Sequence, residues 1–446
     1  MRVCILGTGY VGLTTGVCLA YVGHKVTCID PIVEKIELLR SGGIPIYEPH
    51  LEEMAARARG NLNFSTSYAD GVPDADVIFI AVGTPPMPDG SPDLRYLRAA
   101  AQGVGAHYRG EFVVIVNKST VPIGSGNWTE SILREHLPDS SFAVASNPEF
   151  LREGSAVHDS LYPDRIVIGS DKPRGLETLY SLYRPILDQN FTAPTFLTRP
   201  EGLGAVPLVS TDLASAELIK YAANAFLALK ISFINEIGCL AENVGADIRQ
   251  VAKGIGLDSR IGGKFLQAGI GWGGSCFAKD TSALISTARE YNLSMSIVEA
   301  AREVNQRQRD RMVEKLQAEF KILKGRTIGL LGLAFKPHTD DLRDAPAIDI
   351  GQRLLDRGCK VKAHDPVAMS RFRKEYPDSG IILTADPDEL AKDCDALVLV
   401  TEWPQYRELD WDSIGSRMRS RTILDGRHVL DSAALAGCGF RCLTVC

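Results

Sequence analysis

The alternation of apolar and polar residues at the N-terminus predicts a strand, a glycine turn, a helix and a second strand. The apolar run Val3–Leu6 meets the glycine-rich segment Gly7–Gly12, and apolar residues then recur with helical spacing as far as Val22. The second strand is predicted at Lys25–Ile29, and Asp30 closes it. In this βαβ setting the GxGxxG spacing predicts a dinucleotide site, because its glycines allow a tight turn, close approach of a pyrophosphate and close helix packing.

Asp30 bears on which dinucleotide is bound. A carboxylate at this distance from the glycines accepts a hydrogen bond from the 2′-hydroxyl of the adenosine ribose and repels a 2′-phosphate, so NAD is favoured over NADP. The alternative is a glycine turn in some other α/β protein, with Asp30 acting as a helix cap.

Three more apolar runs, at 76–82, 112–116 and 142–146, have the pattern of buried strands, and small or polar residues follow each of them. Ligands of doubly wound sheets bind at such carboxyl ends. The segment 147–154 follows the third run. If it is helical, Glu149 and Glu153 share one face; they are equally well explained as surface charges or a capping pair.

The middle of the chain predicts one long helix from Asp212 to about Glu242, since it is rich in helix formers and lacks proline. Lys220 and Asn224 lie four residues apart and therefore on one face, among apolar neighbours. A lysine whose stem lies along apolar surface while its charge reaches water is the commoner reading of such a pattern.

The glycine-rich segment 269–280 precedes an uninterrupted helical pattern that runs to about Phe320. Cys276 is therefore predicted at a helix N-terminus, where unpaired N–H groups and the helix dipole favour a thiolate. Asp280, one turn later, is predicted on the same face, where it can hold a water or a substrate hydroxyl. These features indicate a nucleophilic cysteine; the alternative is a buried structural thiol.

The C-terminal third repeats the N-terminal pattern. A strand is predicted at 327–333, a helix at about 345–356, a strand ending in an acid at 359–365, and a further strand at 396–401. A complete GxGxxG is missing, so this half is predicted to hold a different ligand. Lys336, Arg343 and Arg427 are candidates to meet phosphates, although solvated surface charge explains them equally well.

These elements predict an α/β protein with two Rossmann-like, doubly wound parallel-sheet domains joined by a helical central domain that contains one long helix. We expect a dinucleotide-binding domain over 1–200, a central domain over 201–315 and a second nucleotide-binding domain over 316–446.

Composition narrows the functional class. The 446 residues carry 49 Lys and Arg against 55 Asp and Glu, a net charge of −6, which argues against nucleic-acid binding. We expect a cytoplasmic protein, because no stretch of the chain has the pattern of a signal peptide or a membrane span. Ten scattered cysteines without a CxxC pair predict reduced, buried thiols and no metal site, Cys276 excepted. Cys438, Cys442 and Cys446 have no assigned role; they pack, or two of them bridge.

Taken together, the motifs resemble the nucleotide-sugar 6-dehydrogenases, the family that acts on UDP-glucose and GDP-mannose. The resemblance runs from Met1 to about Leu430. It is carried by Gly7–Gly12, Lys118–Pro122, Asn147–Gly154, Lys220 with Asn224, Gly273–Asp280 and Asp425–Arg427. In the segment 269–280, which we call the cysteine loop, two residues depart from the family pattern: Trp272 replaces Tyr or Phe, and Ala278 replaces Pro.

The resemblance implies a four-electron oxidation of UDP-glucose at C6 to UDP-glucuronate, with two NAD consumed, through an aldehyde, a thiohemiacetal and a thioester on Cys276. Another nucleotide sugar such as GDP-mannose is the alternative substrate. Two weaker alternatives are a two-electron hydroxyacid dehydrogenase and a non-catalytic NAD-binding protein. The first would not need Cys276 in its glycine-rich segment. The second would need none of the reactive groups, which are all retained together.

The same resemblance implies the role of each site residue. Cys276 is the nucleophile, Lys220 and Asn224 stabilise the oxyanion, Asp280 holds a water, Glu149 is the base for hydrolysis, and Thr120 positions the hydrolytic water. The cofactor residues are Gly7, Thr8, Gly9, Tyr10, Val11, Gly12, Asp30, Lys35, Thr84, Thr120, Glu153, Lys279 and Arg343. The substrate residues are Glu149, Phe150, Leu151, Lys220, Asn224, Arg260, Phe265, Leu266, Gln267, Gly273, Lys336 and Arg427. Arg260 is expected to reach the substrate from a neighbouring subunit, which implies at least a homodimer with the long helix in its interface.

Overall fold

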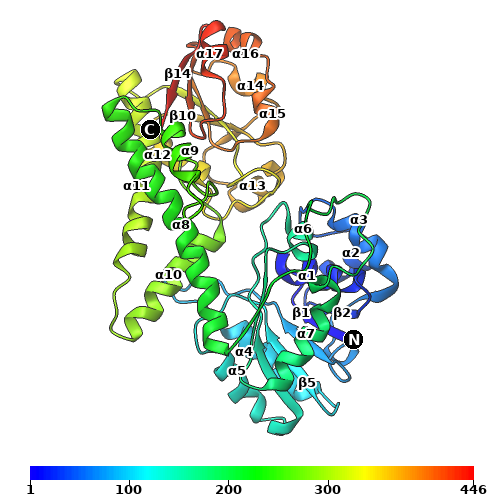
Figure 1. Cartoon of the computed structure of the whole chain (residues 1–446). Coiled ribbons are helices and arrows are strands. Elements are labelled where there is room, and N and C mark those ends of the chain that lie inside the picture. Colours follow the sequence, from blue (N-terminus) through cyan, green and yellow to red (C-terminus); the bar gives the residue numbers. More distant parts are fainter. Residues whose placement is uncertain (446) are drawn as a thin grey trace. The chain divides into compact units, whose positions relative to one another are not determined.

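A computed structural model describes residues 1–445 (Figure 1). The chain forms two compact units. The first consists of Met1–Ala223 with Ser282–Asn292, and the second of Asn224–Thr281 with the chain from Leu293 onward. Each unit is therefore built from two segments that are distant in the sequence.

An eight-stranded sheet is the centre of the first unit. Its strands are β1 (Arg2–Leu6), β2 (Lys25–Ile29), β3 (Leu62–Ser65), β4 (Val77–Ile80), β5 (Val113–Asn117), β6 (Phe142–Ser146), β7 (Ile166–Gly169) and β8 (Leu208–Thr211). They lie in the order β3-β2-β1-β4-β5-β6-β7-β8, and all neighbours are parallel except β6 and β7. The first six strands have the 3-2-1-4-5-6 order of dinucleotide-binding folds, which confirms the predicted doubly wound architecture.

Helices cover both faces of this sheet. They are α1 (Tyr10–Tyr21), α2 (Val33–Ser41), α3 (Leu51–Ala58), α4 (Arg95–His107), α5 (Ser125–Arg134), α6 (Ala156–Leu161) and α7 (Pro173–Leu187). Alternate residues of a central strand pack on opposite faces: Val77 and Phe79 of β4 pack on the side of α1, α3 and α7, whereas Ile78 and Ile80 pack on the side of α4 and α5. Burial on both faces explains why these strands are continuous apolar runs in the sequence.

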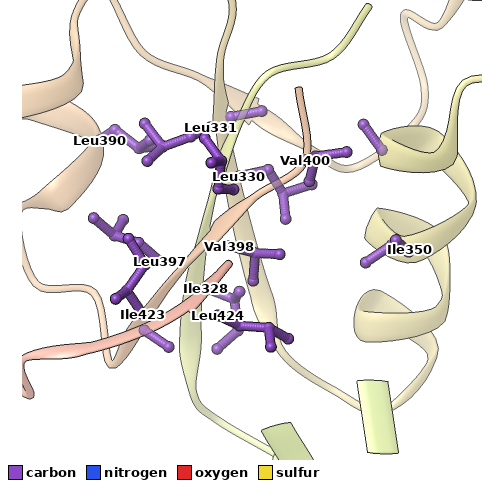
Figure 2. Close-up of a cluster of buried hydrophobic side chains, with 14 of the residues drawn as sticks. Ile328, Leu330, Leu331, Ile350, Leu390, Leu397, Val398, Val400, Ile423 and Leu424 are labelled. Carbon is purple, nitrogen blue, oxygen red and sulfur yellow. The ribbon is translucent and has the colours of Figure 1, made fainter. Parts of the chain in front are cut away.

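The second unit contains a six-stranded parallel sheet. Its strands are β9 (Thr327–Leu331), β10 (Lys360–His364), β11 (Ile382–Leu383), β12 (Ala396–Leu399), β13 (Thr422–Asp425) and β14 (Arg441–Thr444). Their order, β11-β10-β9-β12-β13-β14, repeats the order of the first sheet, so the predicted internal similarity is confirmed. Figure 2 shows the core between this sheet and its helices, where Ile328, Leu330, Val398 and Leu424 from three adjacent strands lie near Ile350.

The helices of the second half of the chain include the predicted long helix, α8 (Leu213–Val244), which passes through both units. The others are α9 (Ile248–Gly256), α10 (Ser275–Glu290), α11 (Ser296–Phe320), α12 (Pro346–Asp356), α13 (Met369–Glu375), α14 (Pro387–Ala391), α15 (Pro404–Arg407), α16 (Trp411–Arg417) and α17 (Ser432–Gly437).

The prediction of an uninterrupted helix from Cys276 to Phe320 was wrong. The chain turns between α10 and α11, where Asn292 adopts a left-handed conformation with φ of 58°. Asparagine tolerates this conformation better than most residues, and its own N–H donates to the carbonyl of Arg289 to close the last turn of α10. The apolar periodicity continues across the break, and for that reason the sequence pattern does not reveal it.

Among residues 1–445, α8 is the one helix long and apolar enough to cross a membrane, by length and composition only. Four of its polar side chains are used inside the fold: Glu217, Lys220, Asn224 and Asn235 are buried and hydrogen-bonded to protein groups.

None of the nine cysteines among residues 1–445 forms a disulfide, and Cys446 lies outside the described residues. Cys438 and Cys442 therefore do not bridge to each other. Burial raises the pKa of Cys18 and Cys28 to about 12, so these thiols stay protonated and unreactive. Cys276 is the only exposed thiol of this part of the chain.

Candidate active site

The turn between β1 and α1 has the geometry of a pyrophosphate cradle. Gly7 has φ of +99°, and a Cβ there would lie 2.6 Å from the carbonyl oxygen of Ala81; a Cβ on Gly12 would lie 2.0 Å from the carbonyl of Gly7. At Gly9, by contrast, a Cβ would meet no atom within 4 Å, so this position is open on the outside. Two glycines are thus required by packing and the third leaves space for a ligand, and this arrangement fits a dinucleotide.

Asp30 is buried at the end of β2 and faces this turn. One of its oxygens accepts hydrogen bonds from the amide and hydroxyl of Thr8 at 2.9 and 2.8 Å, and pairs with the Lys35 ammonium at 2.9 Å. Burial opposes ionisation, but Lys35 and Thr8 outweigh it and hold the pKa of Asp30 below its ordinary value. The structure therefore places Thr8, Asp30 and Lys35 together as an ionised group at the glycine turn.

A buried ion pair joins the segment after β6 to α8. The Lys220 ammonium on α8 lies 2.9 Å from a carboxylate oxygen of Glu149, and both side chains are buried. Burial acts against the charge on Glu149, but Lys220, the amide of Leu151 and nearby Lys118 together hold its pKa below the ordinary value. The reading of Lys220 as a lysine that extends to the surface is thus excluded, and Lys220 and Glu149 form one buried site.

The segment after β6 is not helical, so Glu149 and Glu153 do not share a helix face. The backbone turns at Gly154, whose φ is +83°, and α6 begins only at Ala156. Glu48, which the sequence does not single out, fixes this turn by accepting hydrogen bonds from the amides of Gly154 and Ala156 at 2.7 Å each. No local signal marks Glu48, because its partners are more than a hundred residues away.

Other predicted residues of the first unit lie on the same edge of its sheet. The hydroxyl of Thr84, after β4, donates to the carbonyl of Thr120, after β5, at 3.0 Å. The Lys220 ammonium lies 5.4 Å from the ring centre of Phe150. The hydroxyl of Tyr10 accepts the amide hydrogen of Gly154, so α1 also contacts the segment that carries Glu153.

The glycine-rich segment of the second unit is held by its backbone. Asn305 of α11 accepts the amide hydrogen of Trp272 at 2.8 Å and donates to its carbonyl at 3.0 Å, and Arg309 adds a second donor to that carbonyl. Gly269 is bound at its amide by Asn235 and at its carbonyl by Gln308, at 2.8 Å each. Side chains from α8 and α11 therefore fix the loop before it enters α10.

Cys276 is the second residue of α10, as predicted, and it is exposed. Gly273, three residues before Cys276, has no room for a side chain, since a Cβ there would lie 2.6 Å from the carbonyl oxygen of Asp344. At a helix N-terminus the unpaired backbone N–H groups favour a negative charge, so this position suits a thiolate nucleophile.

Asp280 follows one turn later and is fully buried. Its carboxylate accepts a hydrogen bond from the side-chain amide of Asn224 at 2.6 Å and contacts the Lys279 ammonium. Asn224 lies one turn after Lys220 on α8, so this helix carries one member of each of two polar clusters: Lys220 with Glu149, and Asn224 with Asp280.

Trp272, which departs from the family pattern, is part of the packing of the fold. The indole is buried, its N–H donates to the hydroxyl of Ser232 at 3.2 Å, and its ring packs edge-on against Phe277. Its bulk is therefore accommodated between α8 and the loop. Nothing in the structure explains Ala278.

The second sheet has an acid at the position that corresponds to Asp30, but it is used differently. Asp365 follows β10 and is fully buried, and its two oxygens accept hydrogen bonds from four backbone amides and from the indole N–H of Trp403. A carboxylate with these partners is not available to a ribose hydroxyl. This half of the chain has the dinucleotide topology without the dinucleotide site.

A cavity of about 430 Å³ in the second unit is lined by α9, the segment 263–268 and the residues after β13. Its lining includes the predicted substrate residues Leu266, Gln267 and Arg427, together with Arg249 and Lys253. Basic side chains beside an apolar wall suit a nucleotide, whose base is apolar on its faces and whose phosphates are anionic.

The remaining predicted residues of the second unit lie outside this lining. Arg343 forms a two-point ion pair with Asp341, and Lys336 lies over the ring of Phe335. Phe265 packs edge-on against Phe277, and Arg260 is 88% exposed in its side chain and pairs with Asp258. Among the residues that the structure describes, no group of His, Cys, Asp and Glu could hold a metal ion.

Comparison with known proteins agrees with this geometry. The chain matches three models of the UDP-glucose/GDP-mannose dehydrogenase family: the NAD binding domain at 1–187, the central domain at 214–307 and the UDP binding domain at 329–432. It is 46% identical to a UDP-glucose 6-dehydrogenase of Rhizobium meliloti (strain 1021), over 99% of this chain and 98% of that protein. It is 44% identical to UDP-glucose 6-dehydrogenase YwqF of Bacillus subtilis (strain 168), over 98% and 96%.

Among solved structures, a UDP-glucose dehydrogenase from Pyrobaculum islandicum matches with a TM-score of 0.87 and 42% identity, covering 96% of this chain and 94% of that one. With a glycine turn for NAD, a thiol at the start of α10 and full-length similarity of this degree, the chain belongs to the UDP-glucose/GDP-mannose dehydrogenase family.

Proposed function

We propose that this protein oxidises the C6 hydroxyl of UDP-glucose to a carboxylate, with two NAD consumed for each sugar. The observation that carries the proposal is the position of Cys276, the exposed thiol at the N-terminus of α10. An oxidation that stops at the aldehyde needs no nucleophile, whereas an oxidation to the acid needs a covalent adduct that can lose a second hydride. Gly7, Gly9, Gly12 and Asp30 would hold NAD at the glycine turn, where it would supply the hydride acceptor of each oxidation.

In the first oxidation the C6 hydroxyl must lose its proton. Lys220 is the donor that stabilises the alkoxide, and its buried position strengthens this interaction because water does not screen it. Asp280 holds the water that takes the proton, and Asn224, bonded to Asp280 at 2.6 Å, fixes its orientation.

In the second oxidation the thiolate of Cys276 adds to the aldehyde carbon. A C–S bond forms, the carbonyl oxygen becomes the oxygen of a thiohemiacetal, and loss of hydride from the same carbon gives a thioester. The unpaired N–H groups at the start of α10 favour the thiolate before attack and again when hydrolysis releases it.

Hydrolysis releases the product. Glu149 takes a proton from a water positioned by Thr120, the hydroxide attacks the thioester carbon, a C–O bond forms and the C–S bond breaks to return the thiolate. In the structure Glu149 is paired with Lys220, which makes it a weak base. Once Lys220 donates to the substrate oxygen, its hold on Glu149 is shared and Glu149 becomes a stronger base.

For the substrate, we infer that the UDP moiety is held in the second unit by Lys336, Arg427 and the segment Phe265–Gln267, beside the 430 Å³ cavity. Gly273, Phe150 and Leu151 are assigned to the sugar. Thr84, Glu153, Lys279 and Arg343 are assigned to the cofactor.

We further propose that the protein is at least a homodimer. Phe226, Phe233 and Leu240 recur every seven residues along α8 and are each about half exposed or more, with Val244 continuing the stripe. A continuous apolar stripe of this kind on a long helix is stabilised when a second copy covers it. Arg260, exposed in one subunit, then reaches the substrate of its neighbour. We place the protein in the cytoplasm, where thiols such as Cys276 remain reduced.

The deciding experiment measures NADH formed per sugar over a panel of nucleotide sugars. Two NADH per UDP-glucose, with UDP-glucuronate as product, is the expected result. A ratio of one, or a preference for GDP-mannose, would contradict the assignment. Cys276→Ser is expected to stop turnover before acid is released, and unchanged steady-state activity in that variant would exclude the covalent route.

A further inference from the structure

We propose that Lys118 is a positioning residue for this reaction: a second buried cation that keeps Glu149 in its carboxylate form while Lys220 is engaged with the substrate. The inference rests on the proposed function, because it assigns a purpose to a group close to the proposed base. No step of the mechanism above uses Lys118.

The fold fixes the Lys118 ammonium in one place. Lys118 follows β5 directly, its amide donates to the carbonyl of Ile80 on β4 at 3.0 Å, and its side chain is buried. The ammonium donates to the side-chain oxygen of Asn147, after β6, at 2.8 Å. Asn147 is itself held, since the Tyr183 hydroxyl donates to the same oxygen and the Asn147 amide donates to the carbonyl of Val167, both at 2.6 Å.

The hydrogen bond of Lys118 does not neutralise its charge, because its partner is neutral. The charged groups that act on Lys118 are Glu149 and Lys220. Tyr183, which packs beside it, is kept neutral because burial raises its pKa. The carboxylate of Glu149 is therefore under the influence of two ammonium groups, those of Lys118 and Lys220.

A structural role does not require a charge at this position. A buried ammonium loses its hydration, whereas a neutral hydrogen-bond donor would avoid that loss. Burial, aided by the charge of Lys220 and opposed by Glu149, lowers the pKa of Lys118 to about 8. Burial thus disfavours a cation at position 118. We attribute the presence of lysine at this position to the effect of its charge on Glu149.

The effect on Glu149 follows from electrostatics. A carboxylate beside two cations keeps one of them when the other is drawn to a substrate oxygen. With Lys118 present, Glu149 remains ionised during the moment at which Lys220 stabilises the oxyanion, and it is ready to accept the proton of the hydrolytic water. Without Lys118, Glu149 depends on Lys220 alone and becomes protonated at a higher pH.

The test variant is Lys118→Gln, which keeps a hydrogen-bond donor on a side chain one bond shorter but carries no charge. Its matched control is Lys172→Gln, a lysine of the same unit whose ammonium pairs with Asp139 and Glu130 rather than with Glu149. For each protein kcat and KM are measured with UDP-glucose and NAD from about pH 4 to about pH 10, with thermal unfolding as a check on folding at each pH. A pre-steady-state burst of NADH reports whether thioester hydrolysis has become the slow step.

We expect Lys118→Gln to fold, to show an acid limb of the kcat profile raised by about one pH unit, the low end of the effect of a nearby cation, and to lose up to about tenfold in kcat at pH values below that limb. A burst of NADH and an unchanged KM for NAD are expected alongside. Lys118→Arg, which keeps the charge, is expected to move the acid limb back towards that of the wild type.

An acid limb in the wild-type position with no burst would overturn the inference, whether kcat is unchanged or lowered, because a lowered kcat alone shows only a structural role. If Lys118→Gln does not fold, Lys118→Arg decides: an acid limb displaced despite the retained charge also overturns it. Failure of the proposed function is a different result, because it is seen in the wild type as an NADH ratio of one or a preference for GDP-mannose, or in Cys276→Ser as unchanged activity.

Discussion

Replacing Asn305 by leucine tests whether the cysteine loop is held by its backbone rather than by side-chain packing. Asn305 forms two hydrogen bonds with the backbone of Trp272, four residues before Cys276, and all three groups involved are buried. Leucine has a similar volume but neither donor nor acceptor. The carbonyl of Trp272 keeps a partner in Arg309, whereas its N–H loses the partner shown in the structure.

The effect of Asn305→Leu on stability is set by the one buried N–H group that loses its partner. One buried N–H without a partner lowers the free energy of unfolding by about 1–3 kcal/mol. For a unit of this size each kcal/mol corresponds to about 2–4 °C in the unfolding temperature, so a loss of about 2 kcal/mol gives about 4–8 °C. A loosened loop also weakens the start of α10. The helix terminus favours a thiolate by about 0.3–1 kcal/mol, so alkylation of Cys276 should slow by about two- to fivefold.

Calorimetry measures the unfolding temperature, and iodoacetamide labelling followed by peptide mass spectrometry measures the rate at Cys276 separately from the other thiols. Gln306→Leu is the control, because Gln306 is the neighbouring residue on α11 and is exposed. Asn305→Asp keeps the acceptor for the Trp272 amide but sets a second oxygen against the Trp272 carbonyl, so it should restore the stability only in part. An Asn305→Leu protein that unfolds and alkylates like the Gln306→Leu control would refute this reasoning.

Three further predictions concern other parts of the chain. Burial raises the pKa of Glu217 from 4.5 to about 7, against the opposing amides of Gly124 and Gly126, so the folded state binds this proton more tightly than the unfolded state. That stabilisation is complete below pH 4.5 and is lost as the pH rises through 7. Denaturant unfolding should therefore show the free energy of unfolding of the wild type falling by about 3 kcal/mol relative to that of Glu217→Gln across this range. Parallel dependence on pH in the two proteins would contradict this prediction. Asp30→Asn should raise the ratio of kcat/KM for NADP to that for NAD by at least about tenfold, because a repulsive charge is removed; an unchanged ratio would mean that Asp30 does not select the cofactor. Phe226→Glu should lower the molar mass measured by light scattering without lowering the unfolding temperature of the subunit, since Phe226 is 61% exposed; an unchanged mass would place the subunit interface elsewhere.

The sequence by itself determined the elements whose signal is local. Continuous apolar strands, the glycine turn with Asp30, the long helix and the cysteine at a helix start each depend on residues that are close in the chain, and all of them are present. The second α/β half was visible in the same way, through a repeated order of strands and an acid after β10. The sequence pattern does not reveal the break at Asn292, because a connection of five residues does not disturb the apolar period on either side.

Only the tertiary structure decided which polar residues are buried together. Glu149 and Lys220 are 71 residues apart, Lys118 and Asn147 are 29 apart, and Glu48 binds amides more than a hundred residues away. Nor does the sequence distinguish Asp30, left beside an open glycine turn, from Asp365, whose oxygens are taken by backbone amides and Trp403. The physical reason is the same in each case: a hydrogen bond or ion pair in a buried site depends on which strand ends and helix faces pack together, and only that packing brings such distant residues within reach of each other.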